Sequence, residues 1–402
     1  MAFSKIAQSI GASATLKLNA RAGRMRQAGE PVIHLGGGEP ESQAPESAIA
    51  AGMDLLKTGK IRYTPAAGTP TMRDAIIQYT EKFYGRKVER ANVMASAGAK
   101  QAIMVALMAL VDPGDEVVFP VPYWVSYPDM TRLAGGRPVP VKAADGSIQP
   151  TLDEMAAAIT GRTRVVLLNS PNNPSGQVYG EDFLRGMVRM CEERDVFLMM
   201  DDIYHRLVFD GASRVNCYDF TDREVDEARI IVLNGVSKQY AMTGFRIGWA
   251  VGPRDLIQAM ANIQSHQSGG PCTLSQAAAV AAIKGAQGSV GSLRKTLEVQ
   301  RDEMVALLQE IPKLKIHKPG GTFYCFCDFS AFDGDCTRLS NSLLDLVQVV
   351  TVPGVEFGMP GFLRLSYCGS LSDIREGVRR IKWALDPDGS AELKIGDLVV
   401  RR

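Results

Sequence analysis

The sequence of 402 residues carries almost no net charge, with 45 lysines and arginines against 44 aspartates and glutamates. Nucleic acids and anionic membranes both bind through basic surfaces, so this balance argues against either as the main partner. The chain has no apolar stretch near the roughly 20 residues that cross a bilayer, and residues 1–5 lack the apolar core of a secretory signal. We therefore expect a cytoplasmic protein.

Cysteine spacing of the metal-binding or redox kind is also missing. The seven cysteines are an odd number, and none of them is arranged as in a zinc or CxxC motif. Cys325 and Cys327 lie in an apolar run, where a strand would place both thiols on one face. The sequence thus predicts buried free thiols in a reducing compartment and no bound metal.

What the sequence does have is the length and the pattern of a two-domain α/β protein. A chain of 402 residues exceeds what one core usually supports, so two domains, one of them large, are expected. From about residue 45 to residue 285, short apolar runs alternate with helical stretches such as 100–110 and 182–194. Runs that are almost continuously apolar are typical of parallel strands covered on both faces. The expected strands are Val93–Ser96, Glu116–Pro120, Arg164–Asn169, Val196–Asp201, Ile230–Leu233 and Ile247–Gly252.

The two ends of the chain follow a different pattern. A first helix is expected at 16–27, and a long helix near 292–311 precedes strands at 321–329, 349–353 and 362–367 and a helix at 372–385. We expect an N-terminal arm at 1–45 that belongs in part to a small domain, a large domain at 46–290, a small C-terminal domain at 291–385 and an extension at 386–402. Within the extension, Leu393–Val400 is expected to form one short strand.

A lysine stands just beyond one of the apolar runs. Ser237 and Lys238 follow Ile230–Leu233, and an ammonium group buried at a strand end is costly unless its charge is consumed. A Schiff base with an aldehyde cofactor consumes the charge, and lysine is the side chain suited to that bond. Arg246, eight residues beyond the lysine, then suits a clamp on a phosphate group.

Other predicted strands end in residues that suit the same cofactor, because ligands of open α/β sheets bind beyond the C-terminal ends of the strands. Gly98, Ala99 and Lys100 open a helix, where backbone N–H groups can approach a phosphate. An ordinary strand-to-helix turn explains these three residues better when they are taken alone. Trp124 follows the next strand and either fills the core or stacks on a flat heteroaromatic ring.

Four more polar residues fit this pattern. Asn173 lies in a turn with two prolines and either serves the turn alone or donates its amide to a cofactor oxygen. Asp201 directly follows an apolar run, so we expect it to be buried and to need a cationic partner, such as a protonated pyridine nitrogen, with Tyr204 in reach of a ring hydroxyl. Arg364 suits bidentate capture of a carboxylate, although an outward-facing charge explains it equally well in isolation.

Together these residues make the chain similar to the fold-type I aminotransferases that depend on pyridoxal phosphate, and specifically to the bacterial aspartate aminotransferase subgroup. The resemblance extends from about residue 13 to residue 385. It implies an α/β fold, in which a large domain with a mostly parallel seven-stranded sheet is joined to a smaller α+β domain. The segments that carry it are Leu35–Pro40, Arg62–Gly68, Pro122–Tyr127, Asn169–Gly176, Asp201–Tyr204, Ser237–Trp249 and Gly320–Tyr324.

The resemblance implies a role for each residue at the cofactor. Lys238 would bind the aldehyde covalently and shuttle the proton between the substrate α-carbon and the cofactor. Asp201 would pair with the pyridine nitrogen, Tyr204 and Asn173 would bond the phenolic oxygen, and Trp124 would stack on the ring. The phosphate would be held by Gly98, Ala99, Lys100, Ser237 and Arg246, and by Tyr63 of the neighbouring subunit in a homodimer.

The resemblance also implies how a substrate is held. Arg364 would bind the α-carboxylate with help from Gly38, Trp124 and Asn173, while Lys100, Ser13 and Thr15 would recognise a distal carboxylate. The expected reaction is a ping-pong transfer of the amino group of aspartate or glutamate to 2-oxoglutarate or oxaloacetate. The alternative is that Ser13 only caps the first helix and that Lys100 is a surface or phosphate residue.

Three departures from the family pattern leave the substrate range open. Gly235 stands where many relatives have a phosphate-binding serine, Gly269 and Gly270 replace residues that usually carry a hydroxyl, and the extension after Leu385 is additional. The rival interpretations are an aromatic, prephenate or alanine aminotransferase, and a β-eliminating lyase of the same fold. A non-enzymatic regulator is disfavoured because no basic DNA-recognition module fits before the first helix.

Overall fold

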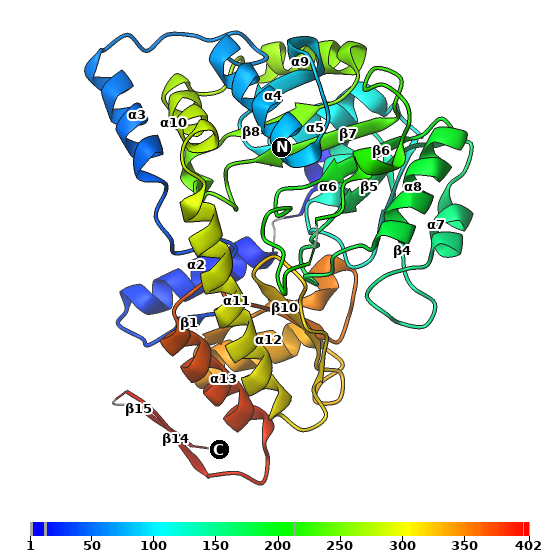
Figure 1. Ribbon diagram of the computed structural model, residues 1–402. Helices are drawn as coiled ribbons and strands as arrows, with labels where there is room; N and C mark the ends of the chain where they lie inside the picture. The colour runs from blue at the N-terminus through cyan, green and yellow to red at the C-terminus, as the bar shows by residue number, and fades with distance from the viewer. Residues whose placement is uncertain (1–2, 12–13, 213, 397, 402) are drawn as a thin grey trace.

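The central element is a sheet of seven strands in the order β2-β8-β7-β6-β5-β3-β4. The computed structural model describes residues 3–11, 14–212, 214–396 and 398–401, and Figure 1 shows the sheet in the larger, upper part of the molecule. Its strands pair in parallel except for β8, which is antiparallel to both of its neighbours. The strands are β2 (Val93–Ser96), β3 (Glu116–Pro120), β4 (Arg137–Val141), β5 (Thr163–Asn169), β6 (Phe197–Asp201), β7 (Ile230–Gly235) and β8 (Gly248–Val251).

Six of the seven strands lie where the apolar runs predict them, and the expected fold class is confirmed. The exception is β4, which the sequence analysis did not predict. This strand contains Pro138 and Pro140 and is partly exposed. It pairs only with β3 and therefore forms an edge of the sheet, where a missing backbone N–H is tolerated.

Helices cover both faces of this sheet. Alternate side chains of one strand enter two different cores: Leu198 and Met200 of β6 pack into one, and Met199 packs into the other. Burial on both faces explains why the strands are apolar throughout. The helices of the first core include α4 (Pro70–Tyr84), α8 (Glu181–Glu193) and α10 (Thr273–Lys284), and those of the second include α5 (Ala99–Leu110), α6 (Tyr127–Leu133) and α9 (Arg254–Gln267). Also in this part are α3 (Glu46–Lys57), α7 (Leu152–Ala158) and the short helices η1 (Arg90–Asn92), η2 (Cys217–Phe220) and η3 (Thr243–Phe245).

A second, antiparallel sheet forms the smaller, lower part of Figure 1, in the order β12-β13-β10-β9. Its strands are β9 (Lys315–Ile316), β10 (Tyr324–Asp328), β12 (Val352–Pro353) and β13 (Phe362–Ser366). The surrounding helices are α11 (Gly288–Gln309), α12 (Cys336–Val347), α13 (Leu371–Leu385) and the short η4 (Gly354–Phe357). Side chains of these elements share a core of their own, in which Phe323, Cys325 and Leu365 are fully buried.

The N-terminal segment packs with this smaller part. It comprises α1 (Lys5–Ser9), α2 (Ala14–Gln27) and β1 (Ile33–His34). β1 pairs in parallel with β11 (Val349–Val350), so that Ile33 lies opposite Val349. The pairing fixes the position of residues 35–40, which run from β1 towards the large sheet.

The C-terminal extension forms a hairpin, which corrects the expectation of one short strand. It consists of β14 (Glu392–Ile395) and β15 (Leu398–Arg401). Leu393 and Ile395 are buried in the same core as Trp383 of α13, while Glu392 and Lys394 are exposed. The indole N–H of Trp383 donates to the carbonyl oxygen of Ser390 at 2.7 Å, which ties the hairpin to the helix. In β14, buried and exposed side chains alternate over only four residues before the turn. A pattern this short does not let the sequence indicate two separate strands.

Within the described ranges, no helix combines the length and the apolar character that crossing a membrane requires. All seven cysteines are free, as predicted, and six of them are buried; Cys272 is exposed, which departs from the expectation of buried thiols.

Candidate active site

The largest concentration of predicted site residues lines a cavity of about 410 Å³ at the C-terminal ends of the parallel strands. The small sheet and residues 36–38 close its other side. Eleven predicted residues meet there: Gly38, Ala99, Lys100, Trp124, Asn173, Asp201, Tyr204, Ser237, Lys238, Arg246 and Arg364. The structure therefore brings together, around one cavity, most of the residues that the sequence analysis proposed for the site.

Of the four other predicted residues, Gly98 and Tyr63 do not line this cavity. Gly98 lies directly behind Arg246, since a Cβ atom on Gly98 would be 2.6 Å from Nη2 of that arginine. Tyr63 is fully exposed on this chain, and its contact with a neighbouring subunit stays a prediction. Ser13 lies outside the described residues, and so does the side chain of Thr15.

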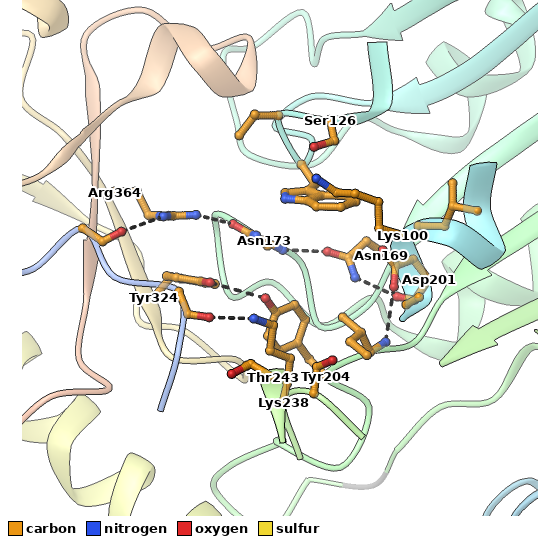
Figure 2. A pocket seen from close by; sticks show the side chains of 18 of the residues that line it. Lys100, Ser126, Asn169, Asn173, Asp201, Tyr204, Lys238, Thr243, Tyr324 and Arg364 are labelled. Carbon is orange, nitrogen blue, oxygen red and sulfur yellow. Dashed lines mark hydrogen bonds between the residues drawn. The ribbon is translucent and has the colours of Figure 1, made fainter. Parts of the chain in front are cut away.

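Lys238 follows the end of β7 and reaches across the cavity to the segment after β1. Its Nζ atom donates to the carbonyl oxygen of Gly38 at 2.6 Å (Figure 2). Burial removes water from the ammonium group and lowers the pKa of Lys238 to about 8. At pH 7 roughly a tenth of the amine is thus neutral, far more than for an ordinary lysine, and the neutral form is the nucleophile.

Asp201 ends β6 and is 4% exposed. Its Oδ2 atom accepts the hydroxyl proton of Tyr127 at 2.8 Å, and its Oδ1 atom accepts the backbone N–H of Ile203 at 3.3 Å. None of the basic groups in the described ranges forms an ion pair with it, and burial raises the pKa of Asp201 to about 6. The carboxylate is therefore placed to receive a cation from a ligand in the cavity.

Tyr204 and Tyr324 form a buried pair. Their hydroxyl oxygens are 3.3 Å apart, and Figure 2 shows both rings beside Lys238. Burial raises the pKa of both phenols, so each remains a neutral hydroxyl that can donate a hydrogen bond. The sequence analysis chose Tyr204 and placed Tyr324 only within the segment Gly320–Tyr324.

A chain of hydrogen bonds joins Arg364 to Asp201 through Asn173 and Asn169 (Figure 2). Nη1 of Arg364 donates to Oδ1 of Asn173 at 2.9 Å. Oδ1 of Asn169 accepts the backbone N–H of Asn173 at 2.7 Å, and Nδ2 of Asn169 donates to the carbonyl oxygen of Asp201 at 2.7 Å. The side-chain oxygen of Asn173 is thus engaged, and its amide nitrogen is the group that can donate to a ligand.

Arg364 is a buried cation without an anionic partner in the structure as described. It lies on β13, is 5% exposed, and contacts the rings of Tyr324 and Phe357 at 4.2 and 5.1 Å from their centroids. Nη2 donates to the carbonyl oxygen of Gly36 at 3.0 Å, while Nε is buried without a partner. A buried guanidinium with a free donor favours an anionic ligand, and the alternative of an outward-facing charge is wrong.

The start of α5 forms a cradle for an anion. The helix has Gly98 as its N-cap with φ 89°, and neither a capping side chain nor an acidic residue occupies its first turn. Arg246 is held over this end of the helix by a hydrogen bond from Nη1 to the carbonyl oxygen of Thr243 at 3.0 Å. Free N–H groups, the positive end of the helix and a guanidinium together favour a phosphate group.

Lys100 and Trp124 meet at the mouth of the cavity. Nζ of Lys100 lies 4.8 Å from the centroid of the Trp124 ring. Partial burial and, to a smaller extent, the nearby Arg246 lower the pKa of Lys100. The indole lines the cavity and can cover a flat ring within it.

Two of the departures from the family pattern have steric reasons. A Cβ atom on Gly235 would lie 2.8 Å from the carbonyl oxygen of Ile247 in the adjacent strand. A Cβ atom on Gly270 would lie 2.3 Å from the hydroxyl oxygen of Thr64. Larger residues at either position would need the surrounding backbone to move, whereas Gly269 has open space but a positive φ of 69°.

Tyr127 and Asn169 are functional candidates that the sequence analysis did not choose. Both lie within segments that carry the family resemblance. Tyr127 contacts the side chain of Asp201, whereas Asn169 lines the cavity and bonds backbone groups of Asn173 and Asp201. The order of residues along the chain gives no sign of these contacts, since 74 residues separate Tyr127 from Asp201.

The family model for aminotransferase class I and II matches residues 30–381. The chain belongs to this family. The family assignment makes the protein an aminotransferase.

Proteins with similar sequences or structures match nearly the whole chain. A probable aspartate/prephenate aminotransferase of Aquifex aeolicus is 39% identical over 93% of this chain and 96% of its own length. An aspartate aminotransferase of Rhizobium meliloti is 39% identical over 94% of this chain and 95% of its own. The structure of the Thermus thermophilus aspartate aminotransferase with maleate has a TM-score of 0.91 at 34% identity, covering 96% of this chain and all of the other.

Proposed function

We propose that this aminotransferase uses pyridoxal phosphate and transfers the amino group of aspartate or glutamate to a 2-oxo acid in a ping-pong reaction. The observation that carries the proposal is the single cavity that unites Lys238, Asp201 and Arg364. Asp201 and Arg364 are buried and Lys238 is partly buried. None of the three forms an ion pair in the structure as described, and each matches one part of the cofactor or the substrate.

The side chains that line the cavity match the chemical groups of the cofactor. Lys238 would hold its aldehyde, Asp201 its ring nitrogen, Tyr204 and the Asn173 amide its phenolic oxygen, and the α5 cradle its phosphate. Bound pyridoxal phosphate supplies an electron sink for the carbanion left at the substrate α-carbon. Once displaced by a substrate amine, the Lys238 amine would take the proton from that carbon and pass it to the cofactor, and it would move a proton in the opposite direction in the second half of the reaction.

Arg364 would bind the α-carboxylate of the substrate. Its free Nε atom and its planar fork suit bidentate contact with a carboxylate. The substitution Arg364→Lys keeps the positive charge but removes the paired N–H donors of the guanidinium group. Since each hydrogen bond to a charged group contributes about 1.5–3 kcal/mol, kcat/KM should fall roughly 10- to 150-fold for every amino donor.

Lys100 would recognise a second carboxylate at the cavity mouth. The solved Thermus thermophilus relative was crystallised with maleate, a dicarboxylate. Prephenate also carries two carboxylates, and a relative is named for aspartate and prephenate together, so Lys100 does not separate these two substrates. The lysine does disfavour alanine, which has no distal carboxylate.

A panel of amino donors tests the substrate class. Aspartate, phenylalanine and alanine would be compared as amino donors with 2-oxoglutarate as the acceptor. Glutamate would be tested as the donor to oxaloacetate and to prephenate, because glutamate with 2-oxoglutarate gives no net reaction. Lys100→Ala should lower kcat/KM for aspartate by about tenfold or more and leave alanine turnover unchanged. Lys142→Ala removes an exposed lysine outside the cavity and serves as the control. Unchanged aspartate turnover in Lys100→Ala would contradict the distal-carboxylate role, and pyruvate release without an acceptor would indicate a lyase.

Borohydride treatment tests the cofactor directly. Reduction of the cofactor-loaded protein should leave a pyridoxyl group on the peptide that contains Lys238, detected by mass spectrometry. A label on any other lysine would contradict the proposed site.

A homodimer would complete the site with Tyr63. Apolar side chains of α3 are exposed, with Met53 54% and Leu56 57% accessible, and the fully exposed Tyr63 follows shortly after them in the chain. α3 lies at the margin of the molecule in Figure 1, where a second copy can cover it. Met53→Glu should shift the protein from dimer to monomer in sedimentation experiments. A dimer unaffected by this charge would place the interface elsewhere.

We extend the proposal to organisation and location. Domain limits near residues 45, 290 and 385 are supported by the separate cores of the two sheets, with the N-terminal arm on the smaller one. Free buried cysteines suit a reducing cytoplasm.

A further inference from the structure

A second cavity lies between the segment that follows β6 and the start of α11. Its volume is about 310 Å³, and its lining includes Arg206, Arg214, Arg294 and Gln287. It shares no lining residue with the cavity that holds Lys238. The proposed transaminase reaction uses none of these side chains.

Two arginines of this cavity contact the same aromatic ring. The guanidinium carbons of Arg206 and Arg214 lie 4.2 and 5.5 Å from the centroid of Phe83. Neither forms an ion pair with a carboxylate in the described ranges. Partial burial and, after it, the charge of Arg206 lower the pKa of Arg214. Two like charges are therefore held together without compensation.

The position of Arg206 is fixed by neutral groups. Its Nη1 atom donates to Oε1 of Gln287 at 2.6 Å and to the hydroxyl of Tyr240 at 3.2 Å. Gln287 is in turn anchored by its amide, which donates to the carbonyl oxygens of Ala282, Ile283 and Gly285. An arginine held this way is ordered before any ligand arrives, which reduces the entropy cost of binding.

The acids near the cavity are already engaged. Glu298 pairs with Arg294 at 3.3 Å and accepts the backbone N–H of Asp210. The Asp210 carboxylate pairs with Arg301, with two contacts of 2.7 Å. They leave the charge of Arg206 and Arg214 unbalanced.

The helix that borders the cavity adds to the positive potential. α11 is 22 residues long, begins beside Gln287, and has neither a capping side chain nor an acidic residue in its first turn. Val290 and Gly291 of this first turn line the cavity together with the arginines. The positive end of a long helix favours an anion at this position.

We propose that this second cavity binds a small oxyanion with two or more negative charges. Arg214 and Arg294 contact the anion from the open side of the cavity, and Arg206 contacts it from the base of the cavity. The shared chemistry is a compact group of anionic oxygens, supplied either by a phosphate compound or by a polycarboxylate. Arg206 stands two residues after Tyr204 in the chain, so one short segment carries a lining residue of each cavity.

Isothermal titration calorimetry of the cofactor-loaded protein tests the proposal, with pyrophosphate and citrate as separate probes at constant ionic strength. We expect saturable binding of at least one probe. Tighter binding of pyrophosphate assigns the site to phosphate compounds, and tighter binding of citrate assigns it to polycarboxylates. Absence of saturable binding by both probes overturns the proposal.

Two variants locate the binding. Arg214→Ala and Arg294→Gln should each weaken the probe about tenfold, as expected for one charged hydrogen bond. Arg185→Ala is the matched control, because Arg185 also lies over an aromatic ring, that of Phe220 at 4.5 Å, but outside the cavity. An anion bound at Arg364 or in the α5 cradle would be indifferent to Arg214 and Arg294. Equal affinity in the wild type and both cavity variants therefore overturns the proposal.

Discussion

Tyr127 donates its hydroxyl to Oδ2 of Asp201 at 2.8 Å, and both side chains are buried. The donor stabilises the ionised form of a carboxyl whose pKa burial raises to about 6. The tyrosine thus helps to keep the charge that a protonated pyridine nitrogen needs opposite it.

Removal of this hydroxyl should weaken cofactor binding. Tyr127→Phe loses a hydrogen bond to a charged group, which contributes about 1.5–3 kcal/mol, so the dissociation constant for pyridoxal phosphate should rise roughly tenfold or more. Equilibrium dialysis measures the change. Tyr179→Phe is the control: its phenol is equally buried but forms no hydrogen bond that involves Asp201. Equal losses in the two variants would show that Tyr127 acts through packing alone.

The pH dependence of folding should report the buried carboxyl in the cofactor-free protein. The pKa of Asp201 is raised from 3.8 to about 6 by burial, so the folded state binds the proton more tightly than the unfolded state. The resulting stability is complete below about pH 4 and is lost as the pH rises through about 6.

Asp201→Asn should remove this dependence. The free energy of unfolding of the wild type, relative to that of the variant, should fall by about 3 kcal/mol between about pH 4 and pH 8, as the size of the shift requires. Urea unfolding at a series of pH values measures it, with Asp222→Asn, an exposed aspartate, as the control. A constant difference across this range would mean that the Asp201 carboxyl is not desolvated.

Uptake of the cofactor by the apoprotein should depend on the protonation of Lys238. Burial lowers the pKa of this amine from 10.5 to about 8, and only the neutral form attacks an aldehyde. The uptake rate, followed by visible absorbance, should rise with pH through a midpoint near 8. A rate that stays flat until about pH 10 would indicate an amine with the ordinary value for lysine.

Substitution of Gly98 should disturb the phosphate cradle. An alanine Cβ atom would lie 2.6 Å from Nη2 of Arg246, and the backbone φ of 89° is unfavourable for any other residue. Gly98→Ala should therefore weaken cofactor binding by roughly tenfold or more and lower stability by about 1–3 kcal/mol. Gly85→Ala separates the two effects, because Gly85 also has a positive φ, 62°, but no atom within 4 Å of the added carbon. It should lose stability without losing cofactor affinity.

The sequence predicted the parts of the fold that depend on local pattern. β2 and β3 have the predicted bounds because both are short, apolar and flanked by turn residues. β4 was missed because Pro138 and Pro140 argue against a strand, and only its edge position makes them tolerable. The hairpin of the extension was missed in part, since the burial of Leu393 against Trp383 depends on tertiary packing.

In the candidate site, too, local pattern was visible in the sequence and tertiary contacts were not. Asp201 and Lys238 could be chosen because a charged residue at the end of an apolar run is conspicuous in the sequence. Tyr127 could not, since its role depends on the distance to Asp201 across two layers of the fold. The paired guanidinium groups of Arg206 and Arg214 were equally hidden, because only the folded chain shows that no carboxylate of the described ranges balances them.

The parallel pairing of Ile33 with Val349 has a consequence for biosynthesis. Residues 36–38, which reach Lys238, directly follow β1, and β1 is held in place by β11. A nascent chain can therefore assemble its large sheet while still on the ribosome, but it cannot become catalytically competent until translation has passed Val350.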